Sequence, residues 1–248
     1  MIPIFVINLP SNKLRKDAVL KNFSDVFGKT VIPAFFEGTN GHLILNDRKC
    51  LDDKIVSNNQ NTELFLRFGK KVTIQDPLTP GEIGCALSHL NLYKYIIENH
   101  IQHALIMEDD TLFKPLFPLV LEQTLKQNIN WDIIQFIHSN GLRDFNLNRK
   151  IIIDKKNNIY LKKAGLGIFD SLFNRRRLSF SAACYLISLK ACKRLIEIGF
   201  PVRLPADYLT GHVAFNQLKL YTCNPQTAFT YTKSFCSDIG ERPKHKLY

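Results

Sequence analysis

Three adjacent acidic residues, Glu108, Asp109 and Asp110, follow the apolar run His103–Met107 without a break. Carboxylates this close repel one another, and the alternation of an extended chain directs Glu108 and Asp110 to one side and Asp109 to the other. Carboxylate oxygens suit hard divalent cations such as Mg²⁺ or Mn²⁺, which in turn bind phosphate oxygens. The pattern therefore predicts a cation site with Asp110 and Glu108 as metal ligands. The simpler alternative is a solvated acidic turn.

Haloacid-dehalogenase-type phosphatases also place acids at the end of a strand. They require Asp at the first and third positions of an Asp-x-Asp-x-Thr pattern, whereas the third position counted from Asp109 is Thr111. This match fails. The interpretation that remains is a carboxylate pair that holds a metal ion and, through it, the diphosphate of a nucleotide sugar.

The elements around the acids alternate between strand and helix. An apolar run at 4–9 predicts a first strand, and Ser11 is the expected cap of a helix over 13–23 with Leu14, Ala18 and Phe23 on one face. The segment Thr79–Glu82 resembles a helix start, because Pro suits the first turn and Glu82 lies at the positive end of the dipole; this helix is predicted to reach about residue 99.

Further strands are predicted at 30–36, 103–107, 131–137, 181–188, 220–222 and 228–231, and further helices at 116–127, 189–198 and 206–215. The alternation indicates a single α/β domain over 1–248, with a Rossmann-type, mainly parallel sheet covered by helices on both faces. Ligands of such sheets bind beyond the carboxyl ends of the strands, which is where the three acids lie. The polar segment 37–75 is expected to be an irregular excursion with one short helix.

The 248 residues include 33 Lys and Arg against 22 Asp and Glu, a formal net charge of +11. A basic excess attracts nucleic acid, phosphate-bearing small molecules or an anionic membrane surface. Nucleic-acid binding stays the alternative function, but it would require a known module or interleaved aromatic and basic residues, and neither is visible. Nucleic acid is therefore not an expected partner.

No apolar run approaches the roughly 20 residues of a membrane helix, and no basic segment precedes the first strand, so a cytoplasmic protein is expected. Basic residues concentrate in 143–177 and in the tail from Glu241, which leads to the hypothesis of peripheral contact with the anionic inner face of the cytoplasmic membrane. The dispersed cysteines have no CxxC spacing, which favours reduced, mostly buried thiols. They are Cys50, Cys85, Cys184, Cys192, Cys223 and Cys236.

Several spaced blocks together resemble glycosyltransferase family 25, the bacterial lipooligosaccharide galactosyltransferases and their collagen galactosyltransferase relatives. The blocks are Ile7–Leu9 with Arg15, Pro80–His89, Ala104–Asp110, Ala183–Ser188, Pro205–Asp207, and Gln226 with Ser237–Ile239. They cover most of the chain in the expected order. The stretches 37–75 and 143–177 match no block of the family.

The resemblance implies a GT-A-like fold and a metal-dependent, inverting transfer of a hexose to a sugar hydroxyl of an oligosaccharide or glycolipid acceptor. The donor is expected to be UDP-galactose, with UDP-glucose or another UDP-sugar left open, and the metal Mn²⁺ or Mg²⁺. Residues 1–135 would bind the nucleotide sugar and 136–248 the acceptor. A further hypothesis is a homologue that keeps the fold without catalysis. The retention of all three acids argues against it.

Candidate donor-binding residues lie in the first two blocks. Asn8 and Leu9 end the first strand and could contact uracil, and Arg15 could face the diphosphate, because guanidinium binds phosphate with two nitrogens. Each also has a structural reading, as a turn residue or a surface cation. Asp109 is assigned to the ribose or to an indirect contact.

Three residues of the second block are also donor-site candidates. Gly84 permits close backbone approach or helix packing, and Ser88 and His89 lie one helical face further on. His89 as a core histidine with satisfied hydrogen bonds is the equal alternative.

Inversion requires a base that takes the proton of the acceptor hydroxyl. Asp207 is the candidate, because Pro205 fixes the turn before it and the start of a helix keeps a carboxylate ionised; a plain N-cap is the alternative. A third metal ligand would come from His212, His245 or Asp238, and the spacing does not choose among them.

Overall fold

The computed structural model describes residues 2–46, 62–65, 71–74, 78–140, 150–164 and 179–231. The strands are β1 (Ile4–Asn8), β2 (Ala34–Glu37), β3 (Thr62–Phe65), β4 (Lys71–Ile74), β5 (His103–Glu108), β6 (Thr111–Phe113), β7 (Ile133–Gln135), β8 (Ser139–Asn140), β9 (Ile151–Asp154), β10 (Ile159–Ala164), β11 (Ser179–Phe180), β12 (Cys184–Ser188), β13 (Leu220–Asn224) and β14 (Ala228–Thr230). The helices are α1 (Lys13–Phe27), α2 (Gly41–Asn46), α3 (Pro80–Glu98), α4 (Phe117–Leu125), α6 (Leu189–Gly199), α7 (Ala206–Gly211) and α8 (Val213–Asn216).

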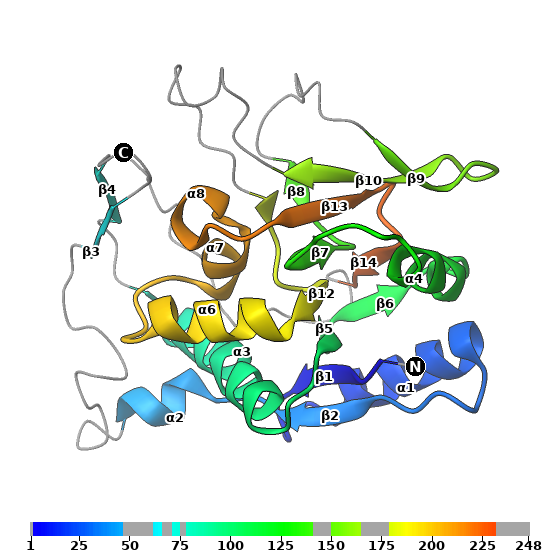
Figure 1. The fold of residues 1–248 in the computed structure, drawn as a ribbon. Helices are drawn as coiled ribbons and strands as arrows, with labels where there is room; N and C mark the ends of the chain where they lie inside the picture. Colours follow the sequence, from blue (N-terminus) through cyan, green and yellow to red (C-terminus); the bar gives the residue numbers. More distant parts are fainter. Residues whose placement is uncertain are drawn as a thin grey trace.

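An eight-stranded sheet in the order β2-β1-β5-β12-β7-β13-β10-β9 organises the chain (Figure 1). β2, β1 and β5 are parallel neighbours, as are β7 and β13. β12 runs antiparallel between β5 and β7, and β10 pairs antiparallel with β13 and β9. The expected α/β class and GT-A-like arrangement are confirmed.

The two faces of the sheet pack against different helices, because successive side chains of a strand point to opposite sides. Phe5 and Ile7 of β1 join a core formed with α3, α6 and α7. Ile4 and Val6 join a second core formed with α1 and α4. The predicted helices on both faces are thus present.

The first helix differs from its prediction in two respects. Its N-cap is Asn12 and makes no side-chain capping bond, so the expected cap by Ser11 is wrong. Its buried residues are Arg15, Val19 and Phe23, whereas Leu14 is 75% exposed. Phe23 is therefore buried as predicted, but Arg15 and Val19 take the inner positions expected for Leu14 and Ala18. Arg15 lies on the inner face because its guanidinium pairs with the buried Asp109.

The helix that begins at Pro80 matches its prediction. Thr79 accepts a hydrogen bond from the Glu82 amide, and the Glu82 side chain accepts one from the Thr79 amide, which forms a capping box. Two of the orphan amide groups at this end are therefore satisfied within the chain, and the start of α3 is fixed beside the edge of the sheet.

Other segments departed from expectation. The helix predicted over 206–215 is two short helices, because His212 between them leaves the helical region with φ −87° and ψ 80°. Within 143–177, β9 and β10 form a hairpin that extends the sheet. Within 37–75, α2 is the expected short helix, and β3 pairs with β4. Residues 47–61, 66–70 and 75 of the first stretch, residues 143–149 and 165–177 of the second, and the tail from residue 232 lie outside the described residues.

Four of the six cysteines fall in the described part of the chain, and all four are free thiols. Three of them, Cys184, Cys192 and Cys223, are buried, as expected, and Cys85 is half-buried. Cys50 and Cys236 lie outside the described residues. Among the described helices, none combines the length and the apolar character needed to cross a bilayer.

Candidate active site

A pocket opens where β1 and β5 end. The two strands are parallel with Ile7 opposite Glu108, so their carboxyl ends reach the same edge of the sheet. The acids that follow β5 therefore lie beside the residues that follow β1. The start of α3 and the loop at 38–42 complete the walls of a cavity of about 110 Å³. Its lining includes Leu9, Arg15, Ser88, His89, Glu108, Asp109 and Asp110, all predicted as site residues.

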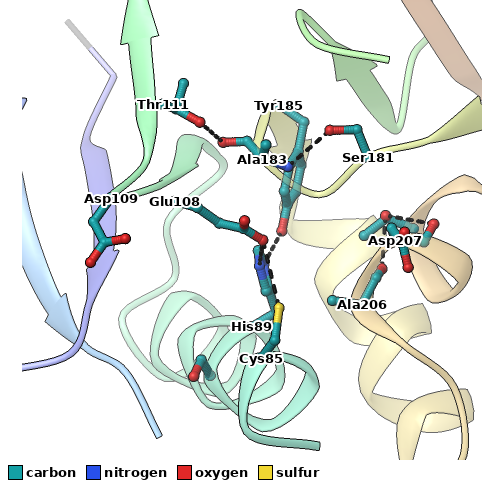
Figure 2. A network of polar contacts seen from close by, with 12 residues as sticks. Cys85, His89, Glu108, Asp109, Thr111, Ser181, Ala183, Tyr185, Ala206 and Asp207 are labelled. Atoms are coloured by element: carbon teal, nitrogen blue, oxygen red, sulfur yellow. Dashed lines mark hydrogen bonds and ion pairs between the residues drawn. The ribbon is translucent and has the colours of Figure 1, made fainter. Parts of the chain in front are cut away.

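Asp109 is held by two of the predicted donor-site residues. The Asn8 side-chain amide donates to Oδ2 at 2.8 Å, and an Arg15 guanidinium nitrogen lies 3.0 Å from Oδ1. Burial raises the pKa of the Asp109 carboxyl, and the hydrogen bonds from Asn8 and Arg15 act in the opposite direction. Asn8 and Arg15 thus hold Asp109 in this structure, and Arg15 also lines the pocket. Figure 2 shows the Glu108 and Asp109 side chains pointing apart, as alternation requires.

Asp110 is the least satisfied of the three acids. Its Oδ1 is buried and has no hydrogen-bond partner among the described residues. Burial, followed by the negative charges of Glu108 and Asp109, raises the pKa of the Asp110 carboxyl to about 7. A buried carboxylate oxygen without a donor carries a large desolvation penalty, which a divalent cation would remove. The residues present therefore fit a hard cation bound through carboxylate oxygens.

Glu108 faces α3, where it contacts two side chains. Its Oε1 lies 3.2 Å from His89 Nε2 and 3.6 Å from Cys85 Sγ. The other ring nitrogen of His89 lies 2.7 Å from the Tyr185 hydroxyl, which in turn contacts the Tyr93 hydroxyl at 2.5 Å. His89 is 1% exposed, so it is both a hydrogen-bonded core residue and part of the pocket wall. Figure 2 shows this cluster between β5 and α3.

Gly84 and Ser88 position the loop that closes the pocket. A Cβ on Gly84 would lie 2.6 Å from both Gly41 N and Thr39 O, so only glycine allows this loop to approach α3 so closely. The Ser88 hydroxyl accepts from the Thr39 amide at 2.8 Å and donates to the Gly84 carbonyl. Of the two readings of Gly84, close backbone approach and helix packing, the structure shows a close approach between α3 and the loop backbone at Thr39 and Gly41.

Asp207 lies in the first turn of α7 and is half-buried. Its Oδ1 accepts a hydrogen bond from the Tyr208 amide at 3.0 Å. α7 packs against α3, and Figure 2 shows Asp207 on the far side of the His89 cluster from Asp109. Asp207 is not part of the pocket lining.

The predicted third metal ligands do not join the acids in the described part of the chain. His212 is buried between α7 and α8 and does not line the pocket. His245 and Asp238 lie outside the described residues. Sequence reasoning missed Cys85 as a neighbour of Glu108 and Tyr185 as a neighbour of His89. Cys85 precedes His89 by one helical turn, which is a signal that could have found it, but nothing in the sequence places Tyr185 of β12 beside them.

Residues 1–210 match the sequence model of glycosyltransferase family 25, described as an LPS biosynthesis protein. A glycosyltransferase 25 family member from Anopheles gambiae is 30% identical over 208 residues, which are 82% of this chain and 30% of that protein.

Procollagen galactosyltransferase 1 of Danio rerio is 39% identical over 62 residues, or 23% of this chain and 10% of that protein. Inactive glycosyltransferase 25 family member 3 of Mus musculus is 24% identical over 168 residues, or 62% of this chain and 27% of that protein. The chain thus spans less than a third of the length of these relatives.

Proposed function

This chain belongs to glycosyltransferase family 25, and we propose that it transfers galactose from UDP-galactose, with inversion, to a sugar hydroxyl of a lipooligosaccharide or related glycan. The observation that carries the proposal is the pocket at the ends of β1 and β5, whose lining includes three adjacent acidic residues. One of them, Asp110, has a buried oxygen without a partner among the described residues. A relative named as a galactosyltransferase supports the choice of sugar.

Asp110 and Glu108 are the proposed ligands of Mn²⁺ or Mg²⁺. Bound there, the ion would stabilise the negative charge of the departing UDP. Asp109 is proposed to contact the ribose or to act indirectly, and this is supported by the hydrogen bonds from Asn8 and Arg15 that fix the orientation of its carboxylate. The Arg15 guanidinium has further donors and lines the pocket, where it can meet the diphosphate.

Asp207 is the proposed general base. It would hold the proton of the acceptor hydroxyl as that oxygen attacks the anomeric carbon. Replacing it with asparagine should lower turnover by about 10²- to 10⁴-fold and leave UDP affinity nearly unchanged, because proton removal belongs to the transition state. Loss of UDP affinity would place Asp207 in the donor site.

Residues 1–135 are proposed to bind the donor and residues 136–248 the acceptor. The pocket described above is lined entirely by residues of the first part, which supports the donor assignment. Of the two basic stretches, residues 143–149 and 165–177 of the first and the whole tail from Glu241 lie outside the described residues.

A cytoplasmic enzyme held on the inner face of the membrane is the proposed setting, supported by the net charge of +11. Each Lys or Arg near an anionic surface contributes about 1 kcal/mol, so a few of them give salt-sensitive attachment. Cosedimentation with anionic vesicles should fall as salt rises. Absence of binding at low salt would refute this setting.

A donor screen tests the function itself. UDP release is measured for UDP-galactose, UDP-glucose and other UDP-sugars against oligosaccharide acceptors, with Mn²⁺ or with a chelator. UDP-galactose should give the highest acceptor-dependent release, and the chelator should abolish it. Preference for another sugar would change the donor, and no release from any donor would favour a catalytically silent homologue.

A further inference from the structure

Three potential metal ligands of different chemistry meet at one wall of the pocket. The Cys85 sulfur, the His89 Nε2 and a Glu108 oxygen all lie within 4.8 Å of one another. Cys85 and His89 are one helical turn apart on α3, a spacing that places both on the same face of the helix. Glu108 reaches them from the end of β5 (Figure 2).

We propose that Cys85, His89 and Glu108 form a second metal site, for a thiolate-binding ion of the Zn²⁺ class. The donor set is the first reason. Hard cations such as Mn²⁺ and Mg²⁺ take oxygen ligands, whereas one sulfur, one imidazole nitrogen and one carboxylate oxygen form a set typical of zinc.

The distances are the second reason. With bonds of about 2.3 Å to sulfur and about 2.0 Å to nitrogen and oxygen, a tetrahedral zinc site has edges of about 3.3 Å (N to O) and about 3.5 Å (S to O). The corresponding separations are 3.2 Å for His89 to Glu108 and 3.6 Å for Cys85 to Glu108. Two edges of the tetrahedron are therefore already formed.

The surroundings of His89 are the third reason. A metal-bound histidine nearly always engages its other ring nitrogen in a hydrogen bond that fixes the ring. His89 Nδ1 lies 2.7 Å from the Tyr185 hydroxyl, and the rings of His89 and Tyr185 are stacked with centroids 5.8 Å apart. Nε2 is thereby turned toward Glu108 and Cys85.

The site would be open rather than closed. Three ligands come from the chain, and all three residues line the pocket, so the fourth position faces the cavity. An ion there would hold Glu108 away from the hard cation at Asp110. Zinc should therefore antagonise manganese, a consequence that rests on the proposed function, whereas zinc binding itself does not.

Cobalt substitution tests the site without reference to activity. The metal-free protein is titrated with Co²⁺, and the near-ultraviolet thiolate-to-cobalt charge-transfer band is recorded, followed by displacement with Zn²⁺. One equivalent of Co²⁺ should give the band in the wild type and in Cys192→Ala, which removes a buried thiol outside the pocket. Cys85→Ser should lose it, and His89→Gln should weaken Co²⁺ binding by 10-fold or more.

Circular dichroism establishes that each variant is folded. A wild type without the band, or a Cys85→Ser variant that keeps it, would overturn the proposed zinc site. Neither result would contradict the proposed manganese-dependent transfer. In the second arm, Zn²⁺ should raise the Mn²⁺ concentration needed for half-maximal transfer in the wild type but not in Cys85→Ser. Equal inhibition of both proteins would refute the antagonism.

Discussion

The unfolding free energy of metal-free Asp110→Asn, measured relative to the wild type, should be more favourable at pH 8 than at pH 5. This is expected although Asp110 is a proposed metal ligand. Burial and the neighbouring carboxylates raise the pKa of Asp110 from 3.8 to about 7. The folded chain therefore binds more protons than the unfolded chain between these values, so its stability falls as the pH rises through them. Asparagine has no proton to release in this pH range, so the variant does not lose this stability.

The magnitude follows from the same two values. At 1.36 kcal/mol per pH unit, the raised pKa of Asp110 costs the folded state about 4 kcal/mol at pH 8, where the side chain is ionised. At pH 5, where the folded chain keeps the proton that the unfolded chain releases, the cost is about 1.5 kcal/mol. The difference in unfolding free energy between Asp110→Asn and the wild type should therefore shift by about 2 to 3 kcal/mol in favour of the variant between pH 5 and pH 8. The constant cost of the amide cancels in this comparison.

Urea unfolding in chelator at the two pH values measures the shift. Asp154→Asn is the matched control, because Asp154 lies on β9 outside the pocket and its hydrogen bond with Asn157 lowers its pKa. Stability linked to a lowered pKa is lost only as the pH falls below 3.8, so the control should show no shift between pH 5 and pH 8. A pH-independent difference for Asp110→Asn would refute the claim that this carboxylate is strained by burial and repulsion.

Three further substitutions test how the pocket is built. Gly84→Ala should lower UDP affinity at least 10-fold by calorimetry, because its Cβ would lie 2.6 Å from the loop backbone; unchanged affinity would show that the loop position is irrelevant to the donor. Arg15→Gln should destabilise the fold by about 1 to 3 kcal/mol in urea, because Asp109 stays buried without its cation, and a neutral effect would contradict the pairing. Thr79→Ala should cost about 1 kcal/mol through loss of the capping box, and no loss would contradict its role at α3.

The sequence was a good guide where residues a few positions apart decide the structure, with the cap by Ser11 as an exception. The start of α3 at Pro80, the apolar run of β5 and the acids that follow it were all predicted and are all present. The partners of those acids did not follow from the sequence in the same way. The contact of Arg15 with the diphosphate stays a prediction, but its ion pair with Asp109, 94 positions away, was not predicted.

Long-range pairing explains the remaining misses. The buried stripe of α1 is set by the ion pair of Arg15 and by packing of Val19 and Phe23, so Leu14, which fits the helical pattern equally well, is left exposed. Tyr185 reaches His89 only because β12 inserts antiparallel beside β5. The topology of a sheet is not encoded in any single segment, so such contacts appear only in the folded chain.

Calorimetric titration of the protein with UDP, in Mn²⁺ and in chelator, tests the central claim most directly, because it requires no acceptor. The wild type and Asp154→Asn should bind UDP at least 10-fold more tightly in Mn²⁺ than in chelator, and Asp110→Asn should lose this difference. Equal UDP affinity with and without Mn²⁺ in the wild type, or a manganese effect that survives in Asp110→Asn, would contradict a metal-assisted donor site at Asp110.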